Sequence, residues 1–165
     1  TGGYGDIKLL PVMQQVETLF AKHHAQELEQ YGIRTLFDLP VDPMPLHGNP
    51  DMISKAVMNI LDNAVYAVVK KVQKNQQFAP EVSLVVTVAD EQYVLKIHDN
   101  GTGIEEKNIS STYDPSSTTK PTSEAAGVGL YLSREIVQNH GGDISVVSVK
   151  DEYTEFTITL PKVKK

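Results

Sequence analysis

The chain of 165 residues contains no cysteine, which excludes a disulfide framework, a cysteine-ligated zinc or iron–sulfur site, and thiol catalysis. It has no basic excess, because 15 Lys and Arg stand against 21 Asp and Glu for a net charge of −6. This balance argues against a nucleic-acid partner, which usually meets a basic face. No apolar run approaches the roughly 18 residues that span a bilayer, and residues 1–10 are too polar for a signal peptide. We therefore expect a soluble, intracellular single domain without direct membrane contact.

Several familiar motifs are also missing. The absence of GxGxxG, GxxxxGK[ST], HRD and DFG excludes a dinucleotide fingerprint, a P-loop NTPase and a eukaryotic-type protein kinase. There is no HExxH, and two neighbouring histidines on a helix, His23 and His24, would not share a face. The sequence therefore predicts no metal site built on histidine.

The apolar periodicity predicts helices and strands in an order that does not alternate regularly. The predicted helices are 11–30, 51–72 and 127–140, and a short one can form at 104–110. The predicted strands are 33–39, 82–89, 92–98, 143–149 and 153–160. A Ser-, Thr- and Pro-rich stretch at 111–126 is typical of a long loop. These elements predict an α+β fold: a two-layer α/β sandwich with a mixed, mostly antiparallel sheet and helices on one face.

The helix predicted at 51–72 has the strongest pattern. Asn49 or Asp51 can cap it, and Pro50 suits its first position. Its apolar residues recur at helical spacing and predict a core stripe: Ile53, Val57, Ile60, Leu61, Ala64 and Val68.

Asp99 follows the strand predicted at 92–98 and continues its apolar, inward-facing side. A carboxylate that faces a core is costly unless a group donates hydrogen bonds to it. The glycines of the turn at 100–103 allow a flat group to approach the backbone closely. Two interpretations stay open here, a ligand contact or a turn in which Asp99 bonds its own loop.

Two asparagines, Asn59 and Asn63, lie four residues apart in the 51–72 helix and share one face with Tyr66 and Lys70. Asparagine is a poor helix former, and amide oxygens can ligate Mg²⁺ beside phosphate oxygens. The other interpretation is a pair of solvent-exposed polar residues.

The segment Gly127-Val128-Gly129-Leu130 begins the helix predicted at 127–140, directly after the long loop. Glycine N–H groups at a helix start can meet an anion, although a flexible junction would explain the glycines equally well. Lys120 in the loop is either solvated or able to swing toward a phosphate.

The order of these motifs is more specific than any one of them. NILDNAVYAV, HDNGTGI, GVGLYLSREIVQNHGG and FTITLP follow one another along the chain. Over residues 7–160 the chain resembles the ATP-binding catalytic domain of sensor histidine kinases, in the superfamily shared with gyrase, Hsp90 and MutL. The four segments resemble its N box, two glycine boxes and final strand, which implies a Bergerat-type fold that binds ATP and Mg²⁺.

The resemblance implies that Asp99 accepts a hydrogen bond from the adenine amino group. Gly101 and Gly103 would let the base lie against the backbone, and Thr154 would lie near the base. Alternation along 153–160 independently turns Thr154 inward.

Asn63 would be the Mg²⁺ ligand, with Asn59 one turn earlier. Asn59 and Lys120 would form the catalytic pair. The other residues that the resemblance places at the nucleotide are Tyr66, Ile104, Gly127, Val128, Gly129 and Leu130.

One position discriminates between activities within the superfamily. The hydrolysing members carry a glutamate general base where this chain has Asn59, which cannot accept a proton from water. Phosphoryl transfer needs mainly positioning and charge neutralisation, so Asn59 favours transfer to a histidine.

Two departures from the family pattern keep other interpretations open. Ser116 and Ser117 replace aromatics in the lid, and Tyr66 replaces a common lysine. The alternatives are a nucleotide-binding module with impaired catalysis, or a gyrase/Hsp90-type ATPase.

The predicted division is a flexible linker remnant at 1–6, the catalytic domain at 7–161 and a basic tail at 162–165. Neither His23 nor His24 matches the family's acceptor histidine. The expected partners are therefore a separate dimerisation domain that carries this histidine and a cognate response regulator. The expected location is the cytoplasm, with a parent protein that can be anchored in the inner membrane.

Overall fold

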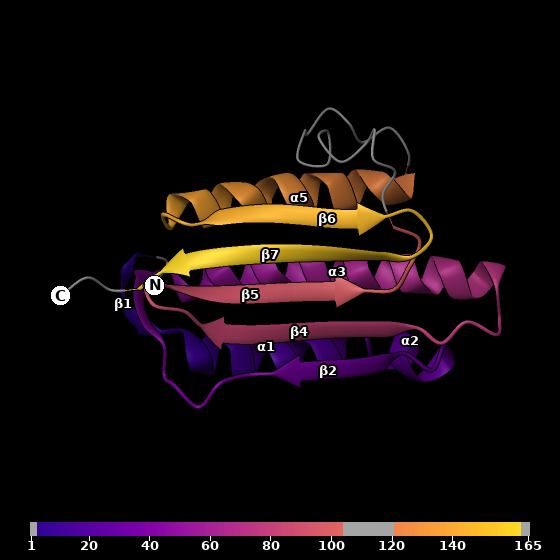
Figure 1. Ribbon diagram of the computed structural model, residues 1–165, viewed down its shortest axis with the longest axis horizontal. Helices are drawn as coiled ribbons and strands as arrows, with labels where there is room; N and C mark the ends of the chain where they lie inside the picture. The colour runs from indigo at the N-terminus through magenta and orange to yellow at the C-terminus, as the bar shows by residue number, and fades with distance from the viewer. Residues whose placement is uncertain (1–2, 104–120, 163–165) are drawn as a thin grey trace.

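The computed structural model describes residues 3–103 and 121–162 (Figure 1). Its helices are α1 (Leu9–His23), α2 (Ala25–Gln30), α3 (Pro50–Lys74) and α5 (Pro121–Asn139). Its strands are β1 (Gly5–Lys8), β2 (Arg34–Asp38), β3 (Pro45–Gly48), β4 (Glu81–Val88), β5 (Gln92–Asp99), β6 (Asp143–Val149) and β7 (Tyr153–Pro161). The short helix predicted at 104–110 lies outside the described residues, as do positions 111–120 of the predicted loop.

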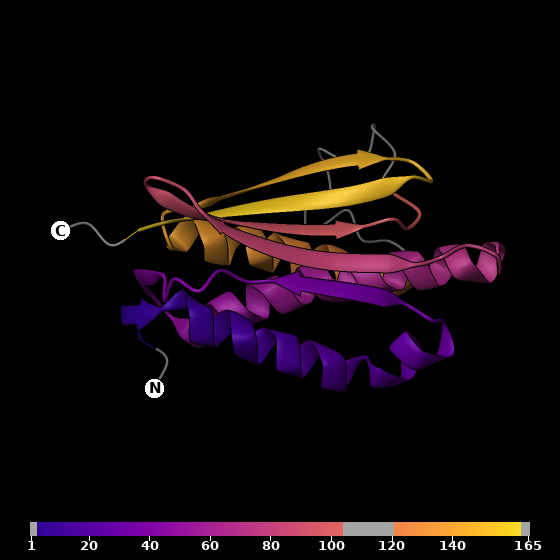
Figure 2. The ribbon, with the colours of Figure 1, turned by 60° about the horizontal axis from the view of Figure 1, so that its bottom comes forward.

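The main sheet has the strand order β2-β4-β5-β7-β6. β2 pairs with β4 in parallel, and the other three pairs are antiparallel. Helices α1, α3 and α5 all lie on one face of this sheet, as Figure 2 shows. The predicted two-layer sandwich with a mixed, mostly antiparallel sheet is therefore confirmed.

Helix α3 is the centre of the core. The Asn49 side chain accepts a hydrogen bond from the backbone N–H of Met52 at 3.0 Å, and Pro50 occupies the first turn, so Asn49 is the cap. All six residues of the predicted apolar stripe are at most 3% exposed. By length and composition α3 could cross a membrane, a feature that the sequence did not predict. Its apolar side chains instead pack in the core that α3 shares with α1, α5, β4 and β5.

Two predictions near the N-terminus are wrong. The helix expected over 11–30 is broken at His24, whose backbone (φ −105°, ψ 16°) leaves the helical region. The buried His24 ring contacts side chains of α2 and α3, a tertiary interaction that periodicity does not reveal. Gly5 and Asp6, expected to be flexible, begin β1 and pair with Gly48 and His47 of β3. That pairing joins segments about 40 residues apart in sequence.

The start of α5 is also corrected, because the helix begins at Pro121 instead of residue 127. Proline suits a first helical turn, and the alanines and the glutamate at 124–126 are good helix formers. Gly127 and Gly129 consequently lie beyond the first turn, where N–H groups are used within the helix and are not free for an anion. The other end agrees with expectation, since Gly141 adopts φ +78° just after the helix.

Candidate functional site

Asp99 ends β5 with its side chain in the core, where the residue is 4% exposed. The backbone N–H of Gly101 donates to Asp99 Oδ1 at 2.9 Å, which confirms the bond to its own loop. Burial raises the pKa of Asp99 from 3.8 to about 7, against the opposing effects of this hydrogen bond and of the Lys71 charge. A buried carboxyl group with such a raised pKa is typical of a functional site.

Thr154 of β7 pairs directly with Asp99 in the sheet and is 5% exposed, so its predicted inward direction is confirmed. Its Oγ1 lies 2.7 Å from Ser148 Oγ, which itself donates to the carbonyl of Tyr153 at 2.9 Å. Because a hydroxyl has one hydrogen, the Thr154 hydroxyl donates to Ser148. The lone pairs of the Thr154 hydroxyl therefore remain available to accept a hydrogen bond.

The contact of Gly101 and Gly103 with a base stays a prediction, and the structure shows that both glycines also lie in close packing. A Cβ at Gly101 would lie 2.6 Å from the Ala67 carbonyl carbon and 2.7 Å from its Cβ. Gly103 has φ +70°, and a Cβ there would meet the carbonyl oxygen of Val149. Both glycines thus let the loop after β5 pack against α3 and the β6–β7 turn, which fixes the surroundings of Asp99.

Lys71 of α3 holds this loop in place, and the sequence did not single it out. Its Nζ donates to the carbonyls of Asn100 at 3.1 Å and Asp151 at 2.7 Å. Asn100 in turn joins β5 to the start of β4, because its side chain accepts from the N–H of Glu81 and donates to the carbonyl of Ala79. Lys71 lies four residues after Ala67, so it projects from the same helix face, which contacts the loop. This spacing is the sequence feature that could have pointed to Lys71.

Asn63 lies one turn before Ala67, and its Nδ2 is buried without a hydrogen-bond partner among the described residues. Asn59 is half-buried one turn earlier. Tyr66 is 38% exposed, with Lys70 Nζ 5.9 Å from its ring centroid. The two asparagines are therefore not the solvent-exposed pair that was the simpler interpretation.

The other predicted site residues divide into two groups. Ile104 and Lys120 lie outside the described residues, as do Ser116 and Ser117. Leu130 is 6% exposed in the hydrophobic core, and Val128 lies with its neighbouring glycines inside α5. The start of α5, the end of β5 and the β6–β7 turn all lie at one end of the molecule, on the right of Figure 1.

Comparison with known proteins agrees with this arrangement. Residues 48–164 match the family model of histidine kinase-, DNA gyrase B- and HSP90-like ATPases. The signal transduction histidine-protein kinase AtoS of Escherichia coli is 32% identical over 132 residues, which cover 80% of this chain and 20% of AtoS. The adaptive-response sensory kinase SasA of Synechococcus is 31% identical over 150 residues, covering 88% of this chain and 36% of SasA. The chain thus spans between a fifth and about a third of these two relatives.

Solved structures show the same fold. The catalytic domain of histidine kinase ThkA has a TM-score of 0.78 at 17% identity, covering 98% of this chain and 99% of that domain. The mycobacterial sensor histidine kinase MprB has a TM-score of 0.76 at 20% identity, covering 99% of this chain and 100% of the solved one. The chain therefore belongs to the family of histidine kinase-, DNA gyrase B- and HSP90-like ATPases, as a catalytic domain of the kind found in two-component sensor histidine kinases.

Proposed function

We propose that this domain binds Mg-ATP and donates the γ-phosphoryl group to a histidine on a separate dimerisation domain. The observation that carries the proposal is the buried Asp99 carboxyl group, on a residue that pairs with Thr154 in the sheet and precedes a loop held by Lys71 and two closely packed glycines. Among the described residues this group accepts a hydrogen bond from the N–H of Gly101, and its remaining lone pairs would accept others from a ligand. An exocyclic amino group of adenine is a donor of the right kind.

Asn63 suits the Mg²⁺ that accompanies the nucleotide. Its Nδ2 is buried without an acceptor among the described residues and would donate to a phosphate oxygen or a metal-bound water, while its amide oxygen is a hard-cation ligand. When bound, Mg²⁺ neutralises phosphate charge and orients the phosphates. Asn63 would hold the ion on the α3 face that contacts the loop after Asp99. The adenine base and the metal ion would then lie beside the same turn of α3.

The start of α5 completes the site. Backbone N–H groups of its first turn, which begin at Thr122 because Pro121 has none, would meet phosphate oxygens at the positive end of the helix. We assign this role to the turn that begins at Pro121 and not to Gly127 and Gly129, which lie deeper in the helix.

Asn59 determines which acceptor the site favours. Its amide cannot take a proton from water, so there is no general base at this position. Asn59 can only help to position the reacting groups. The incoming histidine brings its own nucleophilic nitrogen, for which positioning is sufficient. The domain would act in the cytoplasm, and the phosphohistidine would then pass its phosphoryl group to a response regulator.

Nucleotide binding can be measured by calorimetric titration of Mg-ADP into the domain. We expect Asp99→Asn to weaken binding by about 10–100-fold, the value of a hydrogen bond to a charged group. Asp90→Asn is the matched control, because Asp90 is exposed and lies just before the opposite end of the same strand. Asn63→Ala should weaken binding in Mg²⁺ but not in EDTA. No measurable binding by the unmodified domain would overturn the proposal.

Phosphoryl transfer needs a second assay with radiolabelled ATP and an added dimerisation domain. We expect label on that domain's histidine and little free phosphate. Steady release of phosphate by the domain alone, lost in Asn59→Ala, would instead identify an ATPase.

A further inference from the structure

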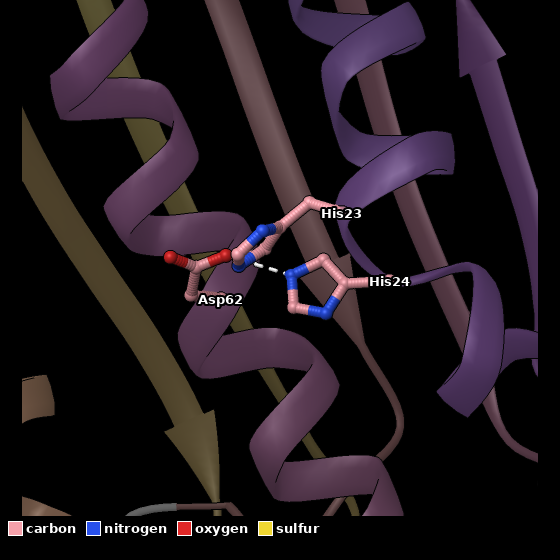
Figure 3. A group of neighbouring side chains, drawn as sticks. All are labelled: His23, His24 and Asp62. Atoms are coloured by element: carbon pink, nitrogen blue, oxygen red, sulfur yellow. Dashed lines mark hydrogen bonds and ion pairs between the residues drawn. The ribbon is translucent and has the colours of Figure 1, made fainter.

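Two histidines and one aspartate converge on the helical face of the molecule, away from the nucleotide site. His23 ends α1, His24 joins α1 to α2, and Asp62 projects from α3 toward both rings (Figure 3). Each residue offers one ligand atom, and the three atoms lie within 4.8 Å of one another. The expectation that His23 and His24 would not share a face is therefore wrong for this pair.

The break in the helix is what brings the two rings together. In a continuous helix neighbouring side chains diverge by about 100°. Because the His24 backbone leaves the helical region, both rings turn to α3 and meet edge to face with centroids 4.7 Å apart. His23 is exposed, whereas His24 is 6% exposed.

His24 is oriented by carboxylates on both sides of its ring. Its Nε2 lies 2.7 Å from Asp62 Oδ1, and its Nδ1 lies 3.2 Å from Glu27 Oε1. A carboxylate on the far nitrogen is the usual outer partner of a metal-binding histidine, because it fixes the tautomer and ring orientation. Glu27 supplies this partner while Nε2 faces the other two groups.

We propose that His23, His24 and Asp62 bind a divalent transition-metal ion of the Zn²⁺ class, with a water molecule as fourth ligand. Imidazole and carboxylate are ligands for such ions, and two histidines with one carboxylate leave one open position. The ion would replace the proton between His24 and Asp62, which passes to solvent. Tetrahedral ligands at about 2.1 Å lie roughly 3.4 Å apart, so the His24–Asp62 pair must open slightly. The Asp62 side chain is 43% exposed and can make this movement.

The competing explanation of this cluster needs no metal ion: His24 is charged and is held by two carboxylates. Burial lowers the pKa of His24, but the hydrogen bonds with Asp62 and Glu27 outweigh it and raise the pKa above 6.5. That explanation accounts for His24, Asp62 and Glu27 but requires nothing of His23. The effect of removing His23 therefore separates the two.

The experiment is a calorimetric titration of ZnCl₂ into the metal-stripped, nucleotide-free domain with any histidine tag removed. We expect one ion per chain, and a loss of affinity in His23→Ala of at least about 10–100-fold, the loss that removing an outer partner of a metal ligand already causes. Asp62→Asn should have a similar effect. His47→Ala is the matched control, because His47 is exposed and also lies beside an aspartate, Asp6 at 3.5 Å.

His23 is exposed, so His23→Ala should remain folded, and unchanged Mg-ADP binding and circular dichroism would verify this. In parallel, titration with Co²⁺ should give visible absorption bands that His23→Ala loses. Zn²⁺ affinity that is the same in His23→Ala as in the unmodified domain would overturn the proposal. A loss of Zn²⁺ affinity in His47→Ala would also overturn the proposal, as would the absence of Zn²⁺ binding by the unmodified domain.

Discussion

Asp99→Asn should change the stability of the nucleotide-free domain in a strongly pH-dependent way. The folded protein raises the pKa of Asp99 from 3.8 to about 7, mainly through burial. The folded state therefore holds the proton more tightly than the unfolded chain, so the free energy of unfolding falls as the pH rises from about 4 to about 7. Asparagine has nearly the same shape, can still accept from the N–H of Gly101, and carries no titrating charge.

The magnitude follows from the size of the pKa change. At about 1.4 kcal/mol per pKa unit, an ionised Asp99 costs the empty fold about 4 kcal/mol at high pH. Between pH 5 and pH 8 the cost grows by about 2.5 kcal/mol, because part of the change lies below pH 5. The amide N–H groups that the substitution introduces need acceptors, and the effect of these groups on stability does not depend on pH.

The measurement is urea denaturation of both proteins at several pH values from 5 to 8. The difference in free energy of unfolding, variant minus unmodified domain, should rise by about 2.5 kcal/mol over this range. Other carboxylates titrate equally in the two proteins and cancel. A difference that stays constant with pH, or falls, would refute the assignment of Asp99 as a buried group with a raised pKa.

Three further predictions test the surroundings of Asp99. Lys71→Met should lower the free energy of unfolding by about 1–2 kcal/mol in urea denaturation, because two carbonyls lose their donor. Lys70→Met, at an exposed neighbour, should cost less than about 0.5 kcal/mol, and equal losses would contradict the role of Lys71. Gly101→Ala should cost about 1–3 kcal/mol by the same method, since its Cβ would meet Ala67, and an unchanged midpoint would contradict this packing. Mg-ADP binding at pH 7 should release protons as Asp99 ionises toward the adenine amino group. Calorimetry in buffers of different ionisation enthalpy measures this release, which Asp99→Asn should reduce.

Much of the fold follows from local patterns in the sequence. The apolar stripe of α3 and the inward alternation along β5 and β7 depend only on helical and strand periodicity, and both are confirmed. The cap at Asn49 and the turn at Gly141 depend on local hydrogen bonding and backbone freedom, which are equally readable. The inward direction of Asp99 and Thr154 followed from the same alternation, so the centre of the candidate site was predictable.

What periodicity missed depends on contacts between distant segments. The break at His24 goes with a contact between its ring and Asp62, 38 residues away, and the N-terminal strand forms by pairing with β3. The early start of α5 was missed for a different reason, because the Ser-, Thr- and Pro-rich composition of 111–126 outweighed the good helix formers at its end.

The sequence by itself therefore determined which side chains face the core and, through the order of its motifs, the family. Only the tertiary structure decided how the loop after β5 is held: α3 fills the space beside Gly101, and Lys71 binds the carbonyls of Asn100 and Asp151. Tertiary contact also brought His23 and His24 to one aspartate. The physical reason is that periodicity reports the direction of a side chain from its own element, whereas a site depends on distances between elements that the chain brings together only on folding.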